Sequence, residues 1–241
     1  MEWRDEGVLL SMRPHGEGSA IIEVLTAAHG RHMGVVRGGA SRKMAPVLQP
    51  GTQIAVEWRA RLDNHIGAFT AEPVRSRAAV LEDPLGLSGL GSVCALLHHA
   101  LPEREPHTLL YRQTIALLDA MVGGQDWGAA YLSWEMVLLD EIGFGLSLGS
   151  CAVTGSREDL AYVSPKTGRA VSRDGAGEWA SRLLPMPSCM LGQGPASTAD
   201  LLAGLTITAH FLTRELAPQL NAGPLPEARA RMISRLQKRG G

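Results

Sequence analysis

The chain has 241 residues, of which 45% are hydrophobic and 20% are charged. This length suits one large domain or two small ones, and the composition is typical of a folded protein rather than a disordered one. No apolar run reaches the ~18 residues that cross a bilayer, and the polar N-terminus lacks the apolar segment of a secretory signal, so we expect neither a membrane nor a secreted protein. Three widely spaced cysteines argue against a disulfide framework and favour the reducing cytoplasm.

The net charge is only −1, but the charge is unevenly distributed. Residues 31–61 carry six basic side chains against one acidic side chain, and no acid follows Glu227 near the C-terminus. Two basic segments on a nearly neutral chain indicate a polyanionic partner, although solvated surface charge explains the counts equally well. The candidate contacts of the first segment are Arg31, Arg37, Arg42, Lys43, Arg59 and Arg61. Those of the second segment are Arg229, Arg231, Arg235, Lys238 and Arg239.

The first eighty residues alternate apolar and polar side chains in short runs that are separated by turns. The runs lie at 8–13, 20–26, 31–37, 54–61 and 69–72. Alternation with this turn spacing predicts an antiparallel sheet or a small barrel. Five strands in about 75 residues match an OB-type barrel, although strand count alone does not exclude an SH3-like barrel. Between the third and fourth runs, the glycines and basic residues of 38–45 predict a flexible loop.

After Pro84 the apolar spacing becomes helical. We expect a flexible joint at 86–91 and helices at about 93–101, 106–122, 126–143, 197–217 and from Pro226 onward. Residues 144–177 lack this periodicity and are rich in Gly, Ser and Thr. The sequence therefore predicts an α+β protein. A five-stranded OB-type β-barrel over 1–80 precedes an α-helical domain over 81–241, which has an irregular insertion at about 144–177.

Motifs for catalysis and metal binding are weak. Gly145-Leu146-Ser147-Leu148-Gly149 matches the nucleophile elbow, but that motif requires a strand-to-helix turn, and here a predicted helix precedes it and an irregular segment follows. His98 and His99 are adjacent, so on a helix they point about 100° apart and cannot hold one ion together. We therefore expect a protein that is not an enzyme. A hydrolase that uses Ser147 is the remaining catalytic alternative.

An ordered set of segments spans nearly the full length of the chain. The set comprises Gly7–Ser11, Arg13–Ile21, the Thr26 to Gly30 turn, Val36-Arg37-Gly38-Gly39, Trp134–Phe144, His210–Arg214 and Leu225–Arg229. In content and order, this set resembles the RecO family of recombination mediators. In that family, the first four segments belong to the N-terminal barrel, Trp134–Phe144 leads into a finger-like insertion with cysteines, and the last two belong to the C-terminal pattern.

The resemblance implies a DNA repair and recombination mediator that acts in the cytoplasm and at the nucleoid. Such a protein binds single- and double-stranded DNA, anneals complementary strands, and with RecR promotes RecA loading on gaps covered by single-stranded-DNA-binding protein. The basic residues of 31–61 would contact phosphates. Those near the C-terminus would contact DNA or hold the acidic C-terminal tail of the single-stranded-DNA-binding protein. The alternative is a non-catalytic OB-fold adaptor that acts mainly through protein–protein contacts.

The insertion departs from the family pattern. Many members are expected to carry two cysteine pairs that hold zinc, but here the first pair is reduced to Cys151, and the second region, 164–174, has no cysteine. Tetrahedral zinc needs four ligands, which one cysteine does not supply. We therefore expect no zinc and no other cofactor, and an insertion that is held together by hydrogen bonds and packing.

Overall fold

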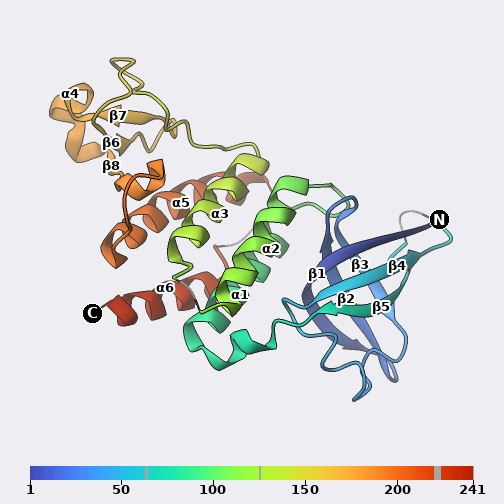
Figure 1. The fold of residues 1–241 in the computed structure, drawn as a ribbon. Helices are drawn as coiled ribbons and strands as arrows, with labels where there is room; N and C mark the ends of the chain where they lie inside the picture. The colour runs from blue at the N-terminus through green and yellow to red at the C-terminus, as the bar shows by residue number, and fades with distance from the viewer. Residues whose placement is uncertain (63–64, 125, 220–223, 241) are drawn as a thin grey trace. The chain divides into compact units, whose positions relative to one another are not determined.

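The computed structural model describes all residues except 63–64, 125, 220–223 and 241 (Figure 1). The described chain forms two compact units, one from 1–125 with 226–232 and the other from 126–225 with 233–241. Strands are followed by helices near the predicted domain boundary at residue 80. The first compact unit extends beyond that boundary, because it runs to residue 125. No helix of the described residues is long and apolar enough to span a bilayer.

Five strands form the N-terminal part of the first unit. They are β1 (Glu2–His15), β2 (Ser19–Thr26), β3 (Gly30–Val36), β4 (Gln53–Arg59) and β5 (Ala68–Arg75). Their order is β1-β2-β3-β5-β4, and β1 pairs with β4, so the sheet closes on itself. The β3–β5 pair is parallel and the other neighbours are antiparallel. The predicted α+β class, with a five-stranded OB-type sheet at the N-terminus, is confirmed.

Alternation along the strands builds the barrel core. In β4, Ile54, Val56 and Trp58 are buried, whereas the residues between them are partly exposed. Successive side chains of a strand point to opposite faces, so one face of β4 supplies the interior. Trp58 is fully buried and donates its indole Nε1–H to the Ile66 carbonyl at 3.0 Å. Trp58 therefore belongs to the barrel core.

The connection between β3 and β4 differs from the flexible loop that its composition predicts. The Ala45 and Leu48 N–H groups donate to the Ser41 and Met44 carbonyls at 3.1 and 2.9 Å. Leu48 is buried in the barrel core, and Met44 packs against the same cluster. The segment is therefore folded onto the barrel, because its apolar residues recur four positions apart and bury together.

Two long helices complete most of the first unit: α1 (Pro84–Ala100) and α2 (Thr108–Val122), preceded by the short helix η1 (Ala78–Glu82). The predicted flexible joint at 86–91 is wrong, because α1 runs through it. The Asp83 carboxylate accepts hydrogen bonds from the Leu85 and Gly86 N–H groups, and Pro84 occupies the first helical turn. This cap starts the helix upstream of the glycines, which apolar spacing alone does not reveal.

The second unit contains α3 (Gly128–Glu141) and α5 (Thr198–Gln219). Between them lie β6 (Leu160–Val163), β7 (Ala170–Ser172), α4 (Arg173–Ala176), η2 (Gly177–Arg182), β8 (Leu184–Pro185) and η3 (Ser188–Leu191). The predicted insertion is therefore not irregular throughout, since it contains a small sheet in the order β7-β6-β8. The last helix, α6 (Glu227–Gly240), has residues in both units.

Candidate nucleic-acid interface

Five of the six predicted contacts of the first basic segment have exposed side chains. We call this set the basic edge: Arg37, Arg42, Lys43, Arg59 and Arg61. Val35 of β3 and Arg59 of β4 both pair with Ala68, so the ends of β3 and β4 flank the start of β5. The closed sheet thereby brings Arg37, just after β3, to the same edge of the barrel as Arg59.

The charges of the basic edge are unequally compensated. Arg59 forms ion pairs with Glu57 and, at 3.1 Å, with Glu2. Burial disfavours ionisation of Glu57, but the guanidinium groups of Arg4 and Arg59 together hold its pKa below the usual range. In the part of the chain that the structure describes, no ion pair engages the other four members of the edge. Those four charges are therefore available to a polyanion.

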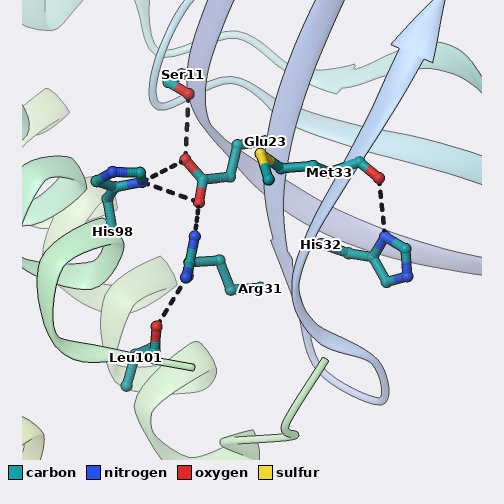
Figure 2. Close-up of polar contacts among 7 residues, drawn as sticks. All are labelled: Ser11, Glu23, Arg31, His32, Met33, His98 and Leu101. Carbon is teal, nitrogen blue, oxygen red and sulfur yellow. Dashed lines mark hydrogen bonds and ion pairs between the residues drawn. The ribbon is translucent and has the colours of Figure 1, made fainter. Parts of the chain in front are cut away.

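Arg31 is not part of the basic edge, although it is one of the six candidate contacts predicted for the first basic segment. Its side chain is 11% exposed and forms an ion pair with Glu23, which is 2% exposed (Figure 2). The Arg31 Nε–H also donates to the Leu101 carbonyl at 3.0 Å. The Glu23 carboxylate in turn accepts from Ser11 Oγ at 3.2 Å and lies 2.8 Å from His98 Nδ1. Arg31 is thus the counter-ion of a buried carboxylate.

Sequence reasoning missed this cluster around Glu23. The signal that could have revealed it is a charged residue inside the otherwise apolar run of β2. A buried carboxylate needs a positive partner and hydrogen bonds, so a basic residue on a neighbouring strand becomes a candidate partner. His98 comes from α1, and the cluster therefore joins the barrel to that helix within the first unit (Figure 2).

The second basic segment forms α6, and four of its five predicted contacts are exposed. They are Arg231, Arg235, Lys238 and Arg239. Arg231 forms an ion pair with Glu227 one turn earlier, at 3.3 Å. The prediction that Arg229 is a surface contact is wrong, because this residue is only 4% exposed. Helical spacing explains this: Arg229 shares one face with the buried Met232 and Leu236, three and seven residues further on.

The geometry around Ser147 is not that of a nucleophile elbow. Its backbone N–H donates to the Gly168 carbonyl at 3.0 Å, and its carbonyl accepts from the Ala170 N–H at 2.9 Å. Ser147 therefore lies along residues 168–170 within the insertion, and the next element after it is the strand β6 rather than a helix. A nucleophile elbow needs a sharp strand-to-helix turn that exposes a strained serine. The structure gives the hydrolase alternative no support.

Comparison with known proteins identifies the family. A family model described as "Recombination protein O N terminal" matches residues 1–77, and one described as "Recombination protein O C terminal" matches residues 81–224. The chain belongs to the RecO family. The break between the two RecO matches falls where the barrel ends, and the resemblance inferred from the ordered segments is confirmed.

Curated relatives carry the name "DNA repair protein RecO". The one from Cereibacter sphaeroides (strain ATCC 17029 / ATH 2.4.9) is 67% identical over 238 residues, which cover 99% of each chain. The one from Dinoroseobacter shibae is 61% identical over 239 residues, again 99% of each chain. The one from Jannaschia sp. is 56% identical over 247 residues and covers both chains fully. Similarity to RecO proteins therefore extends through barrel, helices and insertion.

In the insertion, the expected zinc position of the RecO family is centred on Cys151. This cysteine is buried, and its sulfur accepts hydrogen bonds from the Val153 and Thr154 N–H groups, each at 3.4 Å. Ser172 donates to the same sulfur through its N–H at 3.2 Å and its hydroxyl at 3.3 Å. No group of three or more His, Cys, Asp or Glu that could hold a metal exists among the described residues. Tetrahedral zinc needs four ligands, and among the described residues no such group gathers around Cys151, so the residues present do not fit zinc.

The same hydrogen bonds change the acidity of Cys151. Burial raises the pKa of the thiol, but hydrogen bonds from Ser172 and Thr154 outweigh it and lower the pKa to about 6. Donors that point at the sulfur favour the thiolate over the thiol. The hydrogen bonds from Ser172 to this sulfur join the first turn of the insertion to the end of β7.

Cys151 should therefore make stability depend on pH. Its folded pKa lies below the ordinary value, so its contribution is complete above the unfolded pKa of roughly 8.5 and disappears as the pH falls through about 6. We expect thermal unfolding at several pH values to show a stability difference between wild type and Cys151→Ser that grows from pH ~6 to ~8.5. Cys189→Ser is the control, because burial raises the pKa of that thiol. Parallel pH profiles for wild type and Cys151→Ser would contradict the thiolate.

Proposed function

We propose that this RecO-family protein is a DNA repair and recombination mediator. It binds single- and double-stranded DNA, anneals complementary strands, and with RecR promotes RecA loading on gaps covered by single-stranded-DNA-binding protein. The observation that carries the proposal is the basic edge on an OB-type barrel, where four exposed charges have no ion pair among the described residues. The name shared by the curated relatives supports the role in DNA repair.

The basic edge offers a physical route to these activities. Cationic side chains that contact phosphates release condensed counterions, which gives affinity without sequence preference. When one basic surface neutralises two complementary strands, their mutual repulsion falls, and annealing requires this. The exposed arginines and lysine of α6 would provide a second DNA contact or hold the acidic tail of the single-stranded-DNA-binding protein. DNA binding would place the protein at the nucleoid.

Salt dependence of binding is the decisive test. We expect fluorescence anisotropy with an unstructured oligonucleotide to show tight binding at low salt. The slope of log affinity against log salt should be about −3, since four free charges each contribute about −0.7 on single strands. Strand annealing should fall over the same salt range. Absent binding, or a slope near zero, would refute the basic edge and favour the protein–protein adaptor.

A further inference from the structure

A column of three rings runs from the barrel core to its surface. Trp58 is buried, and the ring centroid of Trp3 lies 5.8 Å from that of Trp58, with an angle of 21° between the planes. His29 stacks on Trp3, with the ring centroids 4.0 Å apart and the planes within 7°. Trp3 packs against the core cluster, whereas His29 lies in the turn between β2 and β3. His29 is therefore the outermost ring of the column.

His29 is held in a fixed orientation. Its ring Nδ1 lies 3.2 Å from the Asp5 carboxylate, which also accepts the Ala28 N–H at 3.0 Å. The His29 N–H donates to Thr26 Oγ1 at 3.0 Å, and Thr108 Oγ1 donates to the Ala27 carbonyl at 3.1 Å. Both the ring and the turn that carries it are thus fixed before any ligand binds. Such preorganisation lowers the entropy that binding would cost.

Part of the His29 ring remains open to solvent. Its side chain is 32% exposed, although one face lies on Trp3 and Nδ1 faces Asp5. Within the basic edge, Arg59 is the member next to the column: it follows Trp58 in β4 and pairs in register with Glu2, which precedes Trp3. A planar ring that is fixed in place and partly open to solvent suits a single strand, whose bases are free to stack. A duplex offers no free base face to such a ring.

We propose that His29 stacks on an unpaired nucleobase of single-stranded DNA and so extends the Trp58–Trp3 column by one ring. The proposal rests on the proposed DNA binding and deepens it by assigning one base contact. The Asp5 carboxylate does not oppose this contact, because a nucleobase carries no charge. The basic edge then supplies affinity for phosphates, and His29 distinguishes a strand with accessible bases from one without them.

The test compares an unstructured oligonucleotide with an abasic oligonucleotide of the same length and charge. Wild type should bind the strand with bases about fivefold or more tightly than the abasic strand. A fivefold ratio corresponds to the lower end of the affinity gain expected from stacking one base. His29→Ala should lose most of this preference, whereas His29→Phe should keep it because the ring is retained. The salt slope and duplex affinity should stay unchanged in both variants, since no phosphate contact is removed.

His15→Ala is the matched control. It removes an exposed histidine at the end of β1, whereas Trp3, on which His29 stacks, is near the start of that strand. Equal binding of the two strands by wild type, or an undiminished preference in His29→Ala, would overturn the stacking contact and leave the proposed function intact. An equal loss in His15→Ala would also overturn it. Failure of wild type to bind either strand would instead overturn the proposed function, and the stacking contact with it.

Discussion

Replacing Arg42 and Lys43 together with glutamine should weaken DNA binding strongly and flatten its salt dependence. Both side chains are exposed, and neither forms an ion pair within the described residues. If each contacts one phosphate, the salt slope on single strands should change from about −3 to about −1.4. Each lost contact should reduce affinity roughly tenfold at ~50 mM monovalent salt. Anisotropy titrations at several salt concentrations measure both quantities.

A matched control for this variant comes from α2. Arg112→Gln also removes an exposed arginine for which the described structure shows no partner, but Arg112 lies outside the basic edge. Its salt slope should equal that of wild type. If the double variant retained the wild-type slope, or if Arg112→Gln reduced it equally, the basic edge would not be the phosphate-binding surface.

Replacing Glu23 with alanine should destabilise the first unit severely. The change removes the carboxylate from a cluster in which Arg31 is almost buried and His98 and Ser11 are its other partners (Figure 2). A buried guanidinium that loses its counter-ion keeps the cost of leaving water without the compensating attraction. Breaking such a pair typically costs about 3–5 kcal/mol. Urea unfolding of the purified variant measures the loss.

Two variants distinguish the buried charge from general effects of mutation. Glu57→Ala removes another barrel carboxylate, which pairs with Arg4 and Arg59, but both arginine side chains are exposed to solvent, so stability should change little. Glu23→Gln keeps one acceptor oxygen and nearly the same side-chain volume, and should be less destabilising than Glu23→Ala. If Glu23→Ala were as stable as Glu57→Ala, the cluster would contribute nothing to the barrel.

Much of the fold could be predicted because it depends on short-range patterns. The buried face of β4 follows from the alternation of Ile54, Val56 and Trp58. The start of α5 follows from Ser197, whose hydroxyl accepts from the Asp200 N–H at 3.2 Å. Capping also explains an error: α1 begins at Asp83 and Pro84, and a stretch of glycines hid that start. Such patterns reveal which elements form more reliably than where each begins.

The candidate site could be predicted only in part, since counting charges does not show where they point. Arg31 and Arg37 are equivalent in sequence, yet Arg31 neutralises Glu23 inside the protein while Arg37 faces solvent. Arg229 and Arg231 differ in the same way, because two residues along a helix turn a side chain by about 200°. Partners distant in sequence decide which cations are free.

The sequence by itself determined the α+β class, the barrel followed by helices, and the family. These features depend on residue type, local periodicity and order along the chain, and all three can be read from the sequence. Only the tertiary structure decided that β3 and β4 end at one edge, that Arg31 neutralises the buried Glu23, and that His29 stacks on Trp3. Ion pairs and ring stacking act over a few ångströms in space, and the closed sheet sets those separations.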